Sequence, residues 1–132
     1  MKEKRIKTER EWFDYNTPLA YDCHVEFVET SVFTRQITQL LSDESYLSLQ
    51  KELIDNPKKG DLIVGGGGIR KIRWRLGNNQ GKSSGIRTIY YYKESDEKIL
   101  MLFAYPKNVA DNLTDNQVAI LGELAKEFHD EK

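Results

Sequence analysis

The residues best suited to chemistry form an alternating row of three cations within residues 69–76: Lys71, Arg73 and Arg75. If this segment is a β-strand, the three side chains share one face, and Ile72 and Trp74 point to the other. We expect Ile72 and Trp74 to enter the core, so the cations should point away from it. Alternate strand residues lie about 6–7 Å apart, close to the phosphate spacing of a nucleic-acid strand. The pattern therefore predicts a phosphate-binding row.

The charge distribution supports this interpretation, although the whole chain has a formal net charge of only −1. Residues 57–93 contain nine basic residues and one acidic residue, Asp61, whereas residues 1–56 and 94–132 are both acidic. A concentrated positive field attracts a polyanion more strongly than the global charge suggests. The alternative is a solvated sheet face with scattered ion pairs.

Such a row could also serve catalysis of RNA cleavage, in which a 2′-OH attacks the neighbouring phosphate. Arginine and lysine stabilise the charge that develops on the phosphorane through charge-assisted hydrogen bonds. Proton transfer usually falls to histidine, but we expect His24 and His129 to be structural or exposed. A lysine within a cationic cluster could act as a base, because neighbouring positive charge disfavours its protonated form.

Other motifs point to ordinary structural roles. The run Gly65–Gly68 precedes no helix, so we expect it to turn the chain sharply into the sheet rather than to cradle a nucleotide. No pair of His, Cys or acidic residues has metal-ligand spacing, so we expect neither metal nor cofactor. Cys23 has no disulfide partner within the chain. Tyr90, Tyr91 and Tyr92 fit either base stacking or strand packing.

The elements that must position the cationic row follow from periodicity. Two antiparallel helices are expected after a strand that starts at His24, with helix starts at Thr30–Ser31 and at Ser42. Three strands should form a meander over residues 69–76, 86–93 and 99–105. Thr114 to Gln117 matches a capping box and starts a last helix. The order β-α-α-β-β-β-α predicts an α+β domain, a small antiparallel sheet with its helices packed on one face.

The totals predict a single domain with an extension. The 132 residues and 39% hydrophobic content suit one small core. We assign residues 1–23 to an N-terminal extension and 24–132 to the domain. No apolar run approaches a membrane span, and the charged start resembles no signal peptide, so we expect a cytoplasmic protein without membrane contact.

Five phrases in order resemble the RelE/HigB toxins of bacterial type II toxin–antitoxin systems. They are Ser42–Leu53, Asn56–Asp61, Gly66–Trp74, Gly85–Tyr91 and Tyr105–Asn108. The resemblance covers roughly residues 25–130 and implies a RelE-like fold. It also implies a metal-independent mRNA endonuclease that cuts mRNA in the ribosomal A site. The implied partner is a cognate helix-turn-helix antitoxin, through which alone the toxin would meet operator DNA.

The resemblance also implies site residues. Motif by motif, the catalytic positions fall on Lys71, Arg73, Arg87 and Lys107. We expect Arg87 to stabilise the phosphorane, and Lys71 or Arg73 to transfer protons or bind phosphate. The expected RNA-binding residues are Arg70, Arg75, Lys82, Tyr91 and Asn108. Some family members carry a catalytic tyrosine shortly after the position of Lys107, and residues 108–114 contain none.

Two other classes of function fit the same residues. A non-catalytic RNA- or ribosome-binding module would use the cationic row without proton transfer. A protein-interaction domain would use it to bind an acidic partner, and this class is compatible with a toxin that binds an antitoxin.

Overall fold

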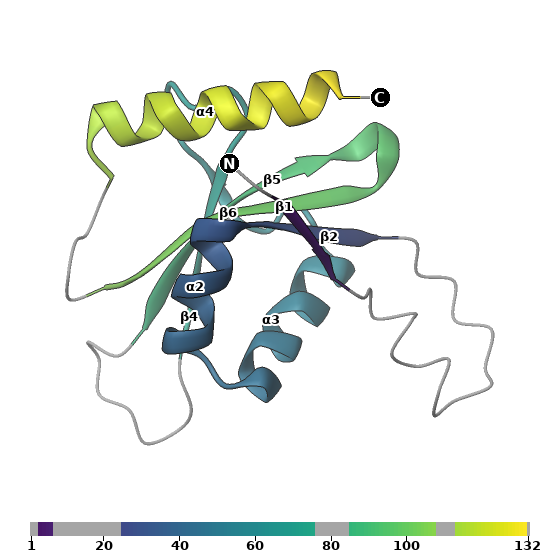
Figure 1. The fold of residues 1–132 in the computed structure, drawn as a ribbon, viewed down its shortest axis with the longest axis vertical. Coiled ribbons are helices and arrows are strands. Elements are labelled where there is room, and N and C mark those ends of the chain that lie inside the picture. The colour runs from purple at the N-terminus through teal and green to yellow at the C-terminus, as the bar shows by residue number, and fades with distance from the viewer. Residues whose placement is uncertain (1–2, 7–24, 76–84, 108–112, 132) are drawn as a thin grey trace.

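A computed structural model describes residues 3–6, 25–75, 85–107 and 113–131 of the chain, with side chains from residue 25 onward (Figure 1). The elements in order are β1 (Glu3–Ile6), β2 (Glu26–Thr30), α2 (Ser31–Leu40), α3 (Asp43–Asp55), β3 (Asp61–Leu62), β4 (Arg70–Trp74), β5 (Ile86–Lys93), a 3-10 turn (Glu94–Asp96), β6 (Lys98–Pro106) and α4 (Asp115–Asp130). The predicted order of helices and strands is confirmed, with the short strands β1 and β3 added. No helix in the described ranges is both long and apolar enough to cross a membrane.

The strands form one sheet in the order β1-β2-β6-β5-β4-β3. The predicted meander of β4, β5 and β6 is antiparallel throughout. Strand β2 lies beside β6 and runs parallel to it, with Phe27 opposite Ile99. The α+β class is therefore confirmed, while the sheet contains one parallel pair that the sequence pattern did not predict. Strand β1, from the N-terminal segment, pairs with β2 at the edge.

Helices cover both faces of the sheet (Figure 1). One core joins α2 and α3 to the sheet and includes Ile72 and Tyr90, with Trp74 packed against it. A second core joins α4 to the opposite face through Leu121, Ala125 and Phe128. The prediction that all helices pack on one face was therefore wrong. Most residues of β5 and β6 are buried on both faces of the sheet, as expected for central strands that helices cover on both sides.

The predicted helix starts are confirmed by their caps. The Thr30 hydroxyl accepts a hydrogen bond from the Phe33 amide, and Ser42 caps α3 in the same way. Thr114 and Gln117 form the complete capping box of α4. These bonds satisfy amide groups that a helix leaves without partners in its first turn.

The glycine run turns the chain into β4, as expected. Gly65, Gly67 and Gly68 adopt φ of 79°, 69° and 109°, a region that other residues rarely occupy.

Tyr90 anchors the turn before β3 by two hydrogen bonds. Its hydroxyl accepts from the Gly60 amide at 2.9 Å and donates to the Pro57 carbonyl at 2.8 Å. This buried tyrosine thus fixes the loop that leads into the cationic strand.

We expect Tyr90→Phe to lower the free energy of unfolding by about 1–3 kcal/mol, because it leaves the buried Gly60 amide without its acceptor. Tyr92→Phe is the matched control, since Tyr92 is only half-buried at the edge of the same core. Urea denaturation of both variants checks the difference. Equal losses would show that the hydroxyl of Tyr90 contributes nothing specific.

Candidate nucleic-acid interface

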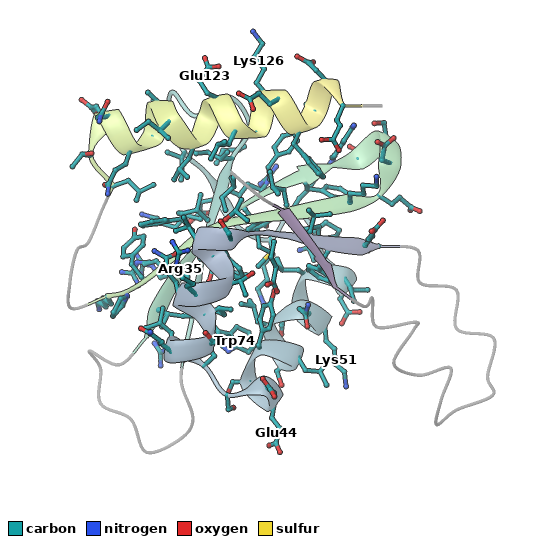
Figure 2. The ribbon with its side chains drawn as sticks, in the orientation of Figure 1. Arg35, Glu44, Lys51, Trp74, Glu123 and Lys126 are labelled. Carbon is teal, nitrogen blue, oxygen red and sulfur yellow. The ribbon has the colours of Figure 1, made fainter. Side chains whose placement is uncertain are left out.

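The cationic row lies on the sheet face that α4 partly covers. Ile69 packs in the core beneath α4, and alternation along β4 places Lys71, Arg73 and Arg75 on that same face. Trp74 lies on the other side, toward α2 and α3 (Figure 2). Arg73 and Arg75 are exposed and Lys71 is half-buried. The row points away from Ile72 and Trp74, as predicted, but its face is not free of helices, because α4 packs on part of it.

The strand register brings Arg87 directly beside this row. Arg73 is the Cα partner of Arg87 across β4 and β5, and Arg87 in turn faces Tyr105 on β6. Two like charges opposite each other on one face repel, which costs folding free energy. A bound anion between the two arginines would remove that cost.

Arg87 is also almost fully buried, with 4% of its surface exposed. Its Nε has no hydrogen-bond partner among the described residues, and no acidic side chain of the described ranges forms an ion pair with Arg73 or Arg87. A buried guanidinium without a carboxylate partner is costly. The arrangement thus places a buried positive group on this face with no acidic partner among the described residues.

Arg75 and Lys107 lie at the next position along the sheet. Ile86 on β5 has Trp74 of β4 on one side and Pro106 of β6 on the other. Because both pairings are antiparallel, Arg75 and Lys107 lie on either side of Gly85, the residue before Ile86. The Lys107 amide donates to the Gly85 carbonyl at 3.0 Å, which fixes its backbone there. The structure therefore brings four predicted residues near Arg87 of β5. Lys71, Arg73 and Arg75 come from β4 and the residue after it, and Lys107 directly follows β6.

Other basic residues of the positive block are held by acids elsewhere in the chain. These ion pairs join Lys58 to Glu94 at 3.2 Å, Lys59 to Glu52 at 2.6 Å and Lys93 to Asp96 at 2.8 Å. The three acids lie away from the row, Glu52 on α3 and Glu94 and Asp96 in the 3-10 turn. The positive field is therefore concentrated on the row more sharply than the sequence count indicates.

Two predicted RNA-binding residues lie apart from the row. Arg70 points to the opposite face, where its guanidinium donates to the carbonyls of Lys58 at 3.1 Å and Gly60 at 2.7 Å. Tyr91 shares the face of the row but lies at the far end of β5, under α4. Lys82 and Asn108 lie outside the described residues. RNA contact by these four residues stays a prediction.

A histidine that the sequence left without a role contacts Tyr91. The Tyr91 hydroxyl and Nδ1 of His129 are 2.6 Å apart, and the rings meet edge to face at 6.0 Å. Burial raises the pKa of Tyr91 above its ordinary value, so the phenol keeps its proton and can donate it to the imidazole. Only the fold could reveal this pair, because 38 residues separate its members.

The fold and site together define a small α+β domain with a row of cationic side chains on one face of its sheet. A family model described as the RelE toxin of the RelE/RelB toxin–antitoxin system matches residues 27–132. Among solved structures, a mutant of the E. coli toxin RelE in the free state is similar at 15% identity, with a TM-score of 0.49. That match covers 74% of this chain and 93% of the other.

The family match spans most of the chain, so this protein belongs to the RelE toxin family of toxin–antitoxin systems. Membership implies a cognate antitoxin as its partner.

Proposed function

We propose that this protein is a ribosome-dependent mRNA endonuclease whose activity is blocked by its antitoxin. The observation that carries the proposal is the pairing of Arg73 with the buried Arg87 in a RelE-family chain. Two arginines on facing strands, one of them fixed by burial, can hold a phosphate between them. The cleavage would take place in the cytoplasm, where ribosomes hold the mRNA.

In this proposal the 2′-hydroxyl loses its proton and its oxygen attacks phosphorus, and Arg87 stabilises the phosphorane that forms. The bond from phosphorus to the 5′ oxygen then breaks, which leaves a 2′,3′-cyclic phosphate and a 5′ oxygen that takes up a proton. The Arg87 guanidinium is already in place, so little reorganisation is needed as charge develops. Lys71 or Arg73 would bind the same phosphate or transfer a proton. Arg75 and Lys107, on either side of Gly85, would hold the adjacent phosphates. The reaction needs no metal ion in this scheme, because the cations supply the charge neutralisation.

Expression in cells followed by mapping of mRNA ends tests the proposal. Induction without an antitoxin should arrest growth and produce cuts at a fixed position within codons. Arg73→Glu should relieve both effects, because it places a carboxylate where phosphate must bind. Harmless expression of the folded wild-type chain would contradict the proposal.

A non-catalytic ribosome-binding module is the second candidate. It is favoured by the absence of a tyrosine from residues 108–114, where some family members carry their catalytic phenol. Such a module would arrest growth and bind ribosomes in a salt-sensitive manner, but the mRNA would stay intact. The mapping of mRNA ends therefore separates the two candidates.

A further inference from the structure

A cleft of about 560 Å³ opens between the glycine turn and α4, at the end of the sheet face that carries the cationic row. Its floor includes Tyr91, and its α4 wall runs from Ala119 to His129. The volume is that of a small-molecule site. None of the groups already assigned to phosphate binding lines this cleft.

The walls consist largely of backbone. Gly65, Gly66 and Gly67 form one side, and Ala119, Gly122 and Ala125 form the other. Gly122 allows the closest approach of the two sides, because a Cβ there would lie 2.9 Å from the Gly66 carbonyl oxygen. The turn and the helix are in contact at that point, and the small residues around it leave a groove edged by peptide groups, against which a flat ring can lie.

The rim carries little net charge. Glu123 and Lys126 project from α4 on the side away from the sheet (Figure 2) and offset each other. The polar side chains at the inner end are the hydrogen-bonded pair Tyr91 and His129. An uncharged aromatic ligand with hydrogen-bonding edges suits this lining better than a phosphate does. Base stacking on aromatic side chains is a general mode of single-strand recognition.

The cleft continues the phosphate-binding row along β5. Arg87, Ile89 and Tyr91 alternate on one face, and Ile89 is the Cα partner of Lys71. Arg87 and Tyr91 are four residues apart, or about 13 Å along the strand. That distance corresponds to about two nucleotide steps of an extended single strand. Ile89, between them, is fully buried beneath α4, so an RNA chain with one phosphate at Arg87 would reach the cleft around α4 rather than along β5.

We propose that this cleft binds one nucleobase of single-stranded RNA, between the glycine turn and the Tyr91–His129 pair. The proposal rests on the proposed function, which places the RNA phosphates on the cationic row. It adds a binding site for one base to that row. It assigns His129 a place beside the ligand, as the residue that orients the Tyr91 ring.

Two nucleotide fragments test the site directly by NMR titration of the wild-type chain. Adenosine 5′-monophosphate should shift the amide signals of Gly65 and Gly67 and the ring signals of His129. Ribose 5-phosphate, which lacks the base, should leave those signals unchanged. Absence of shifts with the nucleotide, or equal shifts with both fragments, would overturn the proposal.

A cleavage-resistant 2′-O-methyl hexaribonucleotide tests whether the base comes from RNA. Removal of one base along the hexamer should weaken binding about tenfold at a single position, as expected for loss of one stacked base. A site for free nucleotides would instead give the signal shifts with adenosine 5′-monophosphate, while removal of a base at any position of the hexamer would leave its affinity unchanged. That result would contradict the proposal. No binding of the hexamer would contradict it equally.

Ala119→Phe should fill the cleft and abolish both the fragment shifts and the base dependence. Ile120→Phe is the matched control, because Ile120 is 53% exposed and lines a different groove on the other side of α4. Equal effects of the two variants would overturn the assignment. Growth arrest and mRNA cutting are measured separately, so failure of the base subsite leaves the proposed endonuclease activity standing.

Discussion

Arg87→Ala is expected to reduce mRNA cleavage on programmed ribosomes by about 100- to 1,000-fold, the usual loss when one fixed transition-state donor is removed. The physical reason is the burial of Arg87 on the face it shares with Arg73. A guanidinium in that position cannot be replaced by water or by an exposed side chain. The measurement is the single-turnover rate of cleavage at one codon.

Two further variants separate chemistry from folding. Arg87→Lys keeps the charge but loses the planar fork, so an intermediate rate is expected. Arg87→Met keeps much of the side-chain volume and removes the repulsion from Arg73, so its unfolding free energy should stay equal or rise by about 0.5 kcal/mol. A protein that is inactive yet at least as stable fits a functional arginine. A large loss of stability would indicate a structural role instead.

Lys51→Ala is the control for overall charge. Lys51 lies on α3, on the opposite side of the sheet from the row (Figure 2). Its removal lowers the net charge as much as Arg87→Ala does, so only a general electrostatic effect would slow both variants. Full activity of folded Arg87→Ala would contradict the assigned role.

The local features of the fold were readable from the sequence, and the reason is physical. Caps such as Thr114 with Gln117, and the alternation around Ile72 and Trp74, depend on residues within a few positions of each other. The face of the cationic row follows from that alternation alone. These parts of the site needed no long-range information.

The placement of α4 depended on distant contacts. Its apolar stripe indicates that it packs on something but not on which face. Strand β6, whose residues 99–105 are almost continuously apolar, gave a signal of burial on both faces. The parallel pairing of β2 with β6 is likewise non-local, since it joins Phe27 to Ile99. Lys93 was counted with the nucleic-acid block, but its partners are Asp96 and the carbonyls of Phe128 and Glu131 at the C-terminal end of α4.

The anchoring of α4 yields the second large prediction, Lys93→Met. The Lys93 ammonium is buried and donates to the carbonyl oxygens of Phe128 at 3.2 Å and Glu131 at 2.5 Å. It also pairs with Asp96 and lies 5.6 Å from the centre of the Phe128 ring. A cation at a helix C-terminus satisfies carbonyls that lack helical partners. We expect the substitution to lower the unfolding free energy by about 2–3 kcal/mol.

The matched substitution is Lys59→Met, which breaks the ion pair with Glu52. That pair is shorter, at 2.6 Å, but its side chains are 46% and 42% exposed. Exposed ion pairs contribute less than about 1 kcal/mol. We therefore expect Lys59→Met to lower the unfolding free energy less than Lys93→Met does, although it breaks the shorter contact. Urea denaturation measures both, and amide hydrogen exchange should show faster opening of α4 in Lys93→Met alone. Equal losses would mean that burial of Lys93 does not set its contribution.

The pH dependence of stability provides an independent check on the same anchor. The hydrogen bond from Lys93 lowers the pKa of Asp96 below its ordinary value. A lowered folded-state pKa means that the Asp96 contribution is complete above the ordinary pKa of aspartate and is lost as pH falls through the lowered one. Lys93→Met should remove that part of the acid dependence, whereas Lys59→Met should retain it. A wild-type slope in Lys93→Met would show that Asp96 is stabilised by other groups.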